Sequence, residues 1–229
     1  MKLLLMIIAS VLMSIPVFAD DIDQREMWEE PSHQLVFEQN NIRILDVRIV
    51  PDVTSEFHSH HFATVYFIVQ DALMQNQDYG DEWGTPVDRQ LRSPGSLMDR
   101  ADYVDINTYH RVKNYDDHTF HLLSVVNSAK PDSTGPDEAA SDGDLLNNPW
   151  FAEHRISLAP GATSEMLSFG NEVVLTQSRE GLAHVVEEGV VHSARSMPGS
   201  WSVHGAGSQF QIVNASVEAQ EFTLIEVRH

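Results

Sequence analysis

The stretch Pro51-Asp-Val-Thr-Ser-Glu-Phe-His-Ser-His-His-Phe-Ala-Thr-Val-Tyr-Phe-Ile-Val-Gln70 determines how the rest of the chain is interpreted. Its second half is rich in β-branched and aromatic residues, which is typical of a β-strand. Because side chains alternate between the two faces of a strand, His58 and His60 are expected to point the same way. Their ring nitrogens can then reach one metal ion, which is the geometry of a chelate.

A third histidine stands further along the chain, in His110-Arg-Val-Lys-Asn114, next to a strand-like run. Three neutral imidazoles suit a catalytic or structural transition metal. We therefore predict that His58, His60 and His110 bind one divalent metal ion. Iron(II) is the metal we expect first, while imidazole ligation leaves zinc, manganese, nickel and copper open.

The length and composition of the chain limit the classes of protein to which it can belong. It has 229 residues, 42% of them hydrophobic, which allows one or two domains with a sizeable core. Its 14 Lys and Arg stand against 34 Asp and Glu, giving a formal net charge of -20. This charge repels phosphate groups and argues against nucleic acids and membrane surfaces as partners. The chain has no cysteine, so its stability must come from core packing, helped by any bound metal.

Residues 1–19 have the pattern of a secretory signal peptide. Lys2 provides a basic start, an apolar run too short to span a bilayer follows, and Ala19 is the small residue expected before the cleavage site. We therefore expect a periplasmic or secreted protein without membrane attachment once the leader is removed. The polar segment 20–31 is expected to cross the surface as an N-terminal arm.

The remainder of the chain indicates strands separated by turns, with almost no amphipathic helix. Segments 34–37, 42–50, 65–69 and 120–126 are rich in β-branched residues, and 75–92 is expected to be a loop-rich insertion. In 42–50 neither set of alternating positions is purely polar, as expected of a strand in a two-sheet sandwich. These features predict an all-β protein built from sandwiches or barrels.

The second half of the chain repeats the first. Segment 51–60 aligns without gaps with 160–169, and two shorter segments, 94–96 and 110–114, align with 198–200 and 210–214. Between them, 131–149 is rich in Asp, Ser, Pro, Gly and Asn and predicts a linker. In the second copy, Leu167, Phe169 and Phe210 replace the three histidines. We therefore expect no metal there and a scaffolding role for that copy.

At these residues the chain resembles the cupin superfamily in its two-domain, bicupin form. His58 and His60 match the histidine pair of the first family motif, and His110 with Asn114 matches the end of the second. The resemblance covers roughly 37–126 and, more weakly, 155–227. It implies two tandem cupin domains, each a double-stranded β-helix or jelly roll, with the metal inside the barrel. Members of the superfamily include dioxygenases, isomerases, lyases and non-catalytic binding proteins.

The chain departs from the family pattern at several positions. Asp52 replaces the family glycine, Asp105 and Asn107 stand where the second motif has Pro and Gly, and the family glutamate falls on Thr64 or Val65. The expected site therefore has three histidines and no carboxylate, as in cupins that resemble thiol and diketone dioxygenases. A metal held in this way keeps one more unit of positive charge and at least one more open coordination position.

Two further residues are candidates for catalysis. Tyr66 shares the interior parity of His60, so its phenol is expected either to serve as a hydrogen-bond donor and proton relay or to be an ordinary core tyrosine. Glu56 precedes His58 on the same face and is a candidate general base, although its equivalent Glu165 persists in the copy without histidines, which favours a structural role in the turn.

The domain boundaries follow from these patterns. We predict a signal peptide at 1–19, an N-terminal metal-binding cupin domain at 20–130, a linker at 131–149 and a degenerate C-terminal cupin domain at 150–229. The function expected is that of a periplasmic three-histidine iron(II) dioxygenase-type enzyme acting on a small organic molecule. A metal-assisted isomerase or lyase, or a non-catalytic binding or sensing module, remains as the alternative. A homodimer formed through strand edges is an expectation from the family alone.

Overall fold

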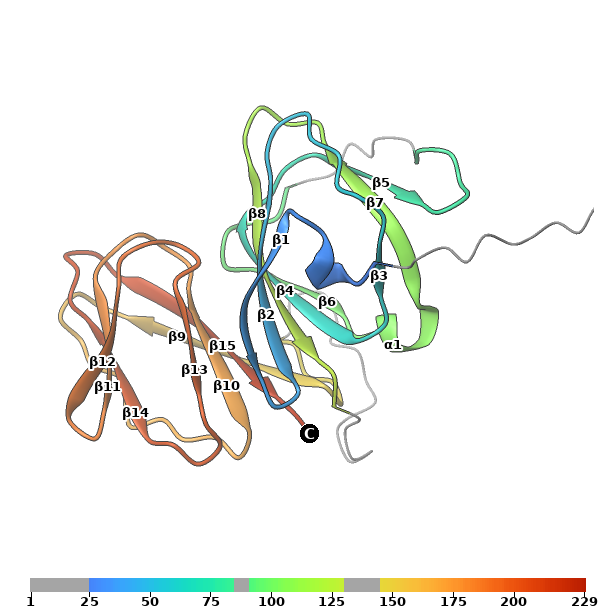
Figure 1. Ribbon diagram of the computed structural model, residues 1–229. Helices are drawn as coiled ribbons and strands as arrows, with labels where there is room; N and C mark the ends of the chain where they lie inside the picture. The colour runs from blue at the N-terminus through green and yellow to red at the C-terminus, as the bar shows by residue number, and fades with distance from the viewer. Residues whose placement is uncertain (1–24, 85–90, 130–144) are drawn as a thin grey trace, which may run out of the picture.

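The computed structural model describes residues 25–84, 91–129 and 145–229 and places them in two β-barrels that lie side by side (Figure 1). The predicted signal peptide and most of the predicted linker, 131–149, lie outside the described residues. Within the described ranges, no helix is both long and apolar enough to cross a membrane. The expectation of an all-β chain with two tandem jelly-roll domains is confirmed.

The first barrel consists of a five-stranded sheet, in the order β1-β2-β8-β4-β6, and a three-stranded sheet, in the order β3-β7-β5. Neighbouring strands in both sheets are antiparallel. The elements are η1 (Met27–Glu29), β1 (His33–Gln39), β2 (Ile42–Ile49), β3 (His58–His60), β4 (Ala63–Gln70), β5 (Met74–Asp78), β6 (Leu97–Arg100), α1 (Tyr103–Ile106), β7 (Thr108–Asn114) and β8 (Phe120–Asn127).

The second barrel repeats this plan with a four-stranded sheet, in the order β13-β10-β15-β9, and a three-stranded sheet, in the order β12-β11-β14. Its elements are β9 (Phe151–Leu158), β10 (Glu172–Gln177), β11 (Ala183–Glu187), β12 (Val190–Arg195), β13 (Trp201–His204), β14 (Phe210–Asn214) and β15 (Gln220–Val227). The sheet containing β10 and β15 faces the sheet of the first barrel that contains β2, β4 and β8 (Figure 1).

The two faces of β2 explain why the sequence 42–50 has no purely polar side. Leu45, Val47 and Ile49 lie in the apolar cluster inside the first barrel. Ile42 and Ile44 point the other way and join a cluster that includes buried residues of β10 and β15. The second apolar face of β2 is thus covered by the neighbouring domain, and burial of this shared core holds the two barrels together.

Strand pairing and backbone conformation agree with the sequence repeat at matched positions. His58 pairs with His110 across β3 and β7, and Leu167 bridges Phe210 at the equivalent place in the second barrel. The residue at the family glycine position has a left-handed backbone in both copies, with φ 61° at Asp52 and φ 73° at Gly161. Aspartate is one of the few residues that adopt this conformation at low cost, so its presence preserves the turn.

Asn114 and Asn214, which match each other in the repeat, have a structural role. The Asn114 side-chain amide donates to the carbonyls of Ile49 and His118, both at 2.8 Å, and its oxygen accepts from the backbone N–H of Asp116. Asn214 forms the same kind of network, donating to the carbonyls of Leu158, Ala159 and Glu218. Both side chains are fully buried, so each one satisfies backbone groups that water cannot reach.

Two glycines form a reciprocal contact across the domain interface. Gly95 has φ 86°, and a Cβ there would lie 2.7 Å from Ser178 Cβ in the second barrel. Gly199 has φ 77°, and a Cβ there would lie 2.7 Å from Val69 Cγ2 in the first barrel. Val69 and Ser178 occupy equivalent positions in the repeat, so the two barrels meet around a pseudo-twofold axis.

The N-terminal segment corrects one expectation. Instead of crossing the surface, η1 buries Met27 among the apolar residues of the first barrel, and Glu30 is buried beside it. The Ser59 backbone N–H donates to the Arg25 carbonyl at 2.8 Å, which places the segment along β3. Because β3 is an edge strand of its sheet, the segment covers backbone groups that would otherwise be exposed.

The expected insertion at 75–92 also differs in part. Residues Met74–Asp78 form β5, which pairs with β7, while 85–90 lies outside the described residues. β5 is an edge strand whose residues differ in exposure, so it needs no apolar face. Its sequence, Met-Gln-Asn-Gln-Asp, accordingly shows no apolar alternation. Polar composition alone therefore made this strand look like a loop.

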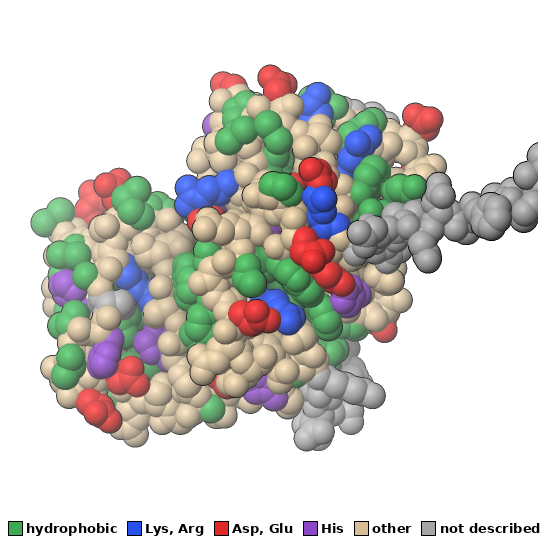
Figure 2. Space-filling view, in the orientation of Figure 1, with side chains coloured by type: hydrophobic (Ala, Val, Ile, Leu, Met, Phe, Trp, Pro, Cys, Tyr) green, Lys and Arg blue, Asp and Glu red, His purple; other side chains and the backbone are tan. Residues whose placement is uncertain are grey.

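The negative charge of the chain is spread over its surface. On the face seen in Figure 2, acidic side chains form small groups over both barrels, separated by uncharged surface. This distribution is typical of a solvated acidic surface. Although the net charge of the chain is -20, the acidic side chains on that face do not gather into one patch to which a cationic partner would dock.

The reciprocal glycine contact can be tested with a matched pair of variants. Gly161 has φ 73°, but a Cβ added there would meet nothing within 4 Å, so Gly161→Ala introduces backbone strain alone, about 1–2 kcal/mol. Gly95→Ala adds a collision with Ser178 and should lower the free energy of unfolding by about 1–3 kcal/mol more. Urea unfolding followed by tryptophan fluorescence measures both. Equal losses would contradict the packing role of Gly95.

Candidate metal centre

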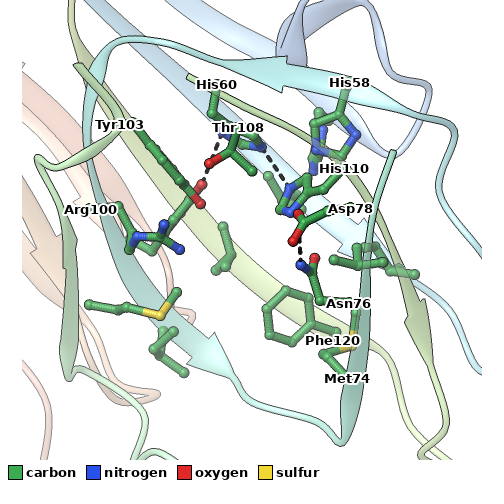
Figure 3. A pocket seen from close by; sticks show the side chains of 18 of the residues that line it. His58, His60, Met74, Asn76, Asp78, Arg100, Tyr103, Thr108, His110 and Phe120 are labelled. Atoms are coloured by element: carbon green, nitrogen blue, oxygen red, sulfur yellow. Dashed lines mark hydrogen bonds between the residues drawn. The ribbon is translucent and has the colours of Figure 1, made fainter. Parts of the chain in front are cut away.

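The antiparallel pairing of β3 with β7 brings the three predicted histidines together. His58 lies directly opposite His110 in the ladder, and His60 stands two residues further along on the same face of β3. The three ring centroids are 4.8–4.9 Å apart, and one nitrogen of each ring lies within 4.8 Å of the others. The sequence prediction that these side chains converge is confirmed (Figure 3).

The hydrogen bonds of the rings show which nitrogens are available for a ligand. His58 Nδ1 lies 2.9 Å from the Glu56 carbonyl, which can only accept, so Nδ1 carries the proton and Nε2 keeps its lone pair. His60 Nδ1 lies 3.3 Å from the Tyr66 hydroxyl, and its Nε2 lies 3.0 Å from Nε2 of His110. This set of neutral nitrogens, oriented from behind by acceptors, fits a first-row transition metal.

Burial keeps these imidazoles neutral. Desolvation lowers the pKa of His58 to about 4, against a smaller opposing effect of the Glu30 carboxylate. Desolvation, together with nearby His58 and Arg100, lowers the pKa of His110 to about 3. The pKa of His60 is also well below its usual value, mainly because its ring is buried. At neutral pH no proton therefore competes with a metal for the three rings.

A fourth histidine and a buried carboxylate, which the sequence analysis missed, lie next to the three rings. The His33 ring meets His58 edge to face at 4.5 Å, and its Nδ1 donates to the Met27 carbonyl at 3.0 Å. The Glu30 carboxylate lies 3.4 Å from His33 Nδ1 and accepts from the backbone N–H of Ser32 and Glu56. Their only sequence signal was the apolar pair Met27-Trp28 in a polar segment, which indicates that the segment packs inward.

Tyr66 is placed to orient a ligand. Its hydroxyl contacts His60 Nδ1 inside the cavity, and burial raises its pKa well above the usual value, so the phenol stays protonated. When His60 presents Nε2 to a metal, Nδ1–H donates to the tyrosine oxygen, and the ring is held in place. The phenol therefore serves at least to fix His60, whichever of its two expected roles applies.

Glu56 does not lie where its predicted role requires. Its side chain is 57% exposed, pairs with Arg25, and does not line the cavity. β3 begins at His58, so the alternation on which the prediction depended does not extend back to Glu56. The expectation that Glu56 faces the site is wrong, and its contribution comes instead from its backbone carbonyl, which fixes His58.

Thr64, at the expected glutamate position, is fully buried. Its hydroxyl donates to the Phe62 carbonyl at 3.0 Å. The grouped metal-binding side chains at this site therefore include no carboxylate, as the sequence indicated.

The three rings line one end of a cavity of about 460 Å³. Its apolar wall includes Met74, Phe120 and Leu122, and polar side chains gather near the histidines. Figure 3 shows Arg100 on the side of His60 and Tyr103, and Asp78 beside His110, with Met74 and Phe120 further away. The cavity is thus large enough for a small organic molecule and offers it distinct polar and apolar ends.

The equivalent positions of the second barrel contain hydrocarbon. Leu167 and Phe210 belong to the apolar core of that barrel, and Phe169 packs against it. The His204 ring stacks on Phe210 at 3.9 Å. Among the described residues of the second barrel, no group of side chains able to hold a metal is found, and the scaffolding role of this barrel stays a prediction.

Comparisons with known proteins agree with this architecture. No protein-family model matches the sequence, and no curated protein sequence matches it. Among solved structures, AerE from Microcystis aeruginosa is 11% identical with a TM-score of 0.59, and the alignment covers 87% of this chain and 99% of that one. Salicylate 1,2-dioxygenase from Pseudaminobacter salicylatoxidans is 12% identical with a TM-score of 0.55, covering 81% and 71%. A cupin 2 conserved barrel domain protein from Leptotrichia buccalis is 13% identical with a TM-score of 0.52, covering 86% and 88%.

The chain has the cupin fold. It contains two cupin barrels in tandem, and the first of them holds a three-histidine group that is consistent with a metal-dependent cupin. At these identities the likeness concerns the fold alone.

Exchange of one histidine for its counterpart in the second cupin barrel tests metal binding. The wild-type protein, purified without a histidine tag, should contain close to one equivalent of divalent metal per chain. His110→Phe copies Phe210 and should reduce that content to background, because two imidazoles hold a metal far more weakly than three. His192→Ala, an exposed histidine elsewhere, is the control. Elemental analysis decides the matter, and full metal content in His110→Phe would contradict the assignment.

The same cupin site makes the stability of the metal-free protein depend on pH. A histidine has a pKa near 6.5 when unfolded, against about 4 for folded His58. Between these values the unfolded chain binds more protons, so the free energy of unfolding falls as the pH decreases from 6.5 towards 4, and it does not change above 6.5 on this account. His58→Leu, which copies Leu167, should reduce the slope of the free energy of unfolding against pH by about 1 kcal/mol per pH unit. Urea unfolding of chelator-treated protein at several pH values between about 4 and 6.5 measures this dependence. If wild type and His58→Leu show the same dependence on pH, the prediction is wrong.

The orienting role of Tyr66 predicts a change in metal affinity. Tyr66→Phe removes the acceptor behind His60 while keeping the ring, so zinc affinity should fall roughly tenfold, the range seen for such supporting contacts. Competition with a chromophoric chelator measures the affinity. Thr64→Val, which removes a hydroxyl bonded only to a backbone carbonyl, serves as the control. Equal zinc affinities of Tyr66→Phe and wild type would exclude this role.

Proposed function

We propose that this chain is a periplasmic, metal-dependent bicupin that acts on a small organic molecule as a three-histidine iron(II) dioxygenase-type oxidoreductase. The observation that carries the proposal is the convergence of three neutral imidazoles from β3 and β7 at the end of a cavity of about 460 Å³. The periplasmic location depends on the expected leader at 1–19.

His58, His60 and His110 would hold the metal, and the contacts of His58 with the Glu56 carbonyl and of His60 with Tyr66 fix the direction of those two rings. A divalent iron in this position supplies open coordination sites and redox chemistry. The protein contributes binding and orientation. Burial of the rings excludes water from one side of the site, and the apolar wall leaves the substrate only the polar end for its donor atoms.

Asp78 is the carboxylate among the described residues that line the cavity. Asn76 Nδ2 donates to its Oδ1 at 3.4 Å, and Figure 3 shows the side chain beside His110. A substrate hydroxyl or enol that approaches the histidines from this side meets a proton acceptor. Asp78 thereby takes the general-base role for which Glu56 is badly placed.

The similarity to salicylate 1,2-dioxygenase supports an oxidative role by analogy of fold. The absence of a carboxylate from the grouped ligands at this site points in the same direction, since it leaves more positions for substrate and dioxygen. A metal-assisted isomerase or lyase would use the same residues without dioxygen. A binding or sensing cupin would use only the cavity.

Oxygen consumption separates these possibilities. Protein reconstituted anaerobically with iron(II) should consume dioxygen in proportion to substrate with at least one member of a panel of thiols, diketones and phenols that includes salicylate. His110→Phe should be inactive because it cannot retain the metal, while His192→Ala should behave as the wild type. Substrate loss without oxygen uptake would identify an isomerase or lyase. Tight ligand binding without turnover would identify a binding module.

A further inference from the structure

We propose that Arg100 is the carboxylate-binding residue of this cavity and that the substrate is a small organic acid, bound with its carboxylate between Arg100 and the three histidines. The inference deepens the proposed function and rests on it for the metal. It adds a substrate class and a specificity-determining residue.

Arg100 ends β6 and lines the cavity on the side of His60. Its guanidinium lies over the Tyr103 ring, 3.9 Å from the ring centroid, and donates from Nε and Nη2 to the two oxygens of Asp102. Asp102 does not line the cavity. Among the described residues no acceptor is found for Nη1, so its N–H groups and the second N–H of Nη2 remain for a forked hydrogen bond to a ligand. Figure 3 shows the group beside the Tyr103 hydroxyl, at the polar end of the cavity.

The pair with Asp102 compensates the charge of Arg100 only in part. The Asp102 side chain is 53% exposed, so water screens its charge. Arg92, the other cation on the wall, differs in this respect: its guanidinium lies 3.8 Å from Asp71, whose side chain is buried. Of the two cationic side chains on the described wall, Arg100 therefore has the charge less compensated by a buried anion.

The ligand set increases the preference for an anion. Three neutral imidazoles would bring no negative charge to a divalent metal, and Arg100 adds a second positive centre close by. Its field reaches His60 and His110, since it contributes to the lowered pKa of both. A carboxylate at this point meets two cations and can take a forked hydrogen bond from the guanidinium.

The rest of the wall sets the orientation and the size of the acid. Asp78, on the side of His110, repels a carboxylate and so directs it towards Arg100. Met74, Phe120 and Leu122 offer an apolar surface to the remainder of the molecule. A volume of about 460 Å³ suits an aromatic or branched acid of modest size and excludes polymeric ligands.

The test compares benzoate with benzamide, which has nearly the same shape without the charge. Zinc replaces iron so that no reaction occurs, and calorimetry gives the two affinities for the full chain. Wild-type protein should bind benzoate roughly tenfold or more tightly than benzamide, as expected for a charge-assisted hydrogen bond. Arg100→Gln should remove that preference while changing benzamide affinity little. Arg100→Lys, which keeps the charge without the fork, should retain part of it.

Arg179→Gln is the matched control, because it removes one positive charge from an exposed pair with Glu221 in the second barrel. Zinc content and the thermal midpoint of each variant show whether the site and the fold are intact. Equal affinity of the wild type for the two probes, or no binding of either, would overturn the inference, and so would an equal loss of both probes in Arg100→Gln. If the wild type takes up no zinc, the proposed function is wrong. The preference for benzoate over benzamide can then be measured without metal, and its loss in Arg100→Gln would still support the role of Arg100.

Discussion

The cavity and its chemistry depend on the register in which β3 pairs with β7. His58 opposes His110 in a ladder only three residues long on the β3 side. A slip of one residue would turn both histidines of β3 to the opposite face and dissolve the site. Neighbouring contacts hold the strand: the Ser55 N–H bonds to the Val112 carbonyl of β7 at 2.8 Å, and the Ser59 N–H bonds to the Arg25 carbonyl of the N-terminal segment. The short strand is thus positioned by neighbours rather than by its own length.

The second barrel has the equivalent strand pairing without the histidines. The Ser164 N–H bonds to the Ile212 carbonyl at 2.8 Å, which repeats the Ser55 contact, and Leu167 bridges Phe210 where the first barrel has two histidines. Hydrocarbon at this place adds to the core without desolvating a polar ring. The imidazoles of the first barrel carry that desolvation cost, visible in their depressed pKa values. Retention of a costly polar group where hydrocarbon fits equally well is what a ligand-binding role explains.

The sequence was sufficient for features that depend on local alternation or on the repeat. The parity of His58 and His60 and the alignment that replaces them by Leu167 and Phe169 are of this kind, whereas His110 was assigned to the site through its match to the second cupin motif. It was insufficient where the chain folds back without a periodic signal. His33 and Glu30 reach the site because η1 packs into the barrel, and Glu56 misses it because β3 starts after it. Arg100 could not be assigned either, since its direction depends on the turn leading into α1.

Glu30 and Arg100, which the sequence did not assign to the site, place opposite charges on its two sides. The Glu30 carboxylate acts on His58, where it partly offsets the effect of burial, whereas Arg100 acts on His60 and His110. The buried carboxylate nearest the three histidines belongs to Glu30, on the N-terminal segment beside His33. A carboxylate in that position can balance part of the charge of a metal without occupying a coordination site. Arg100 lies on the side of His60, whereas Glu30 acts on His58, so an anion bound by Arg100 and the buried Glu30 would lie on different sides of a cation held by the three histidines.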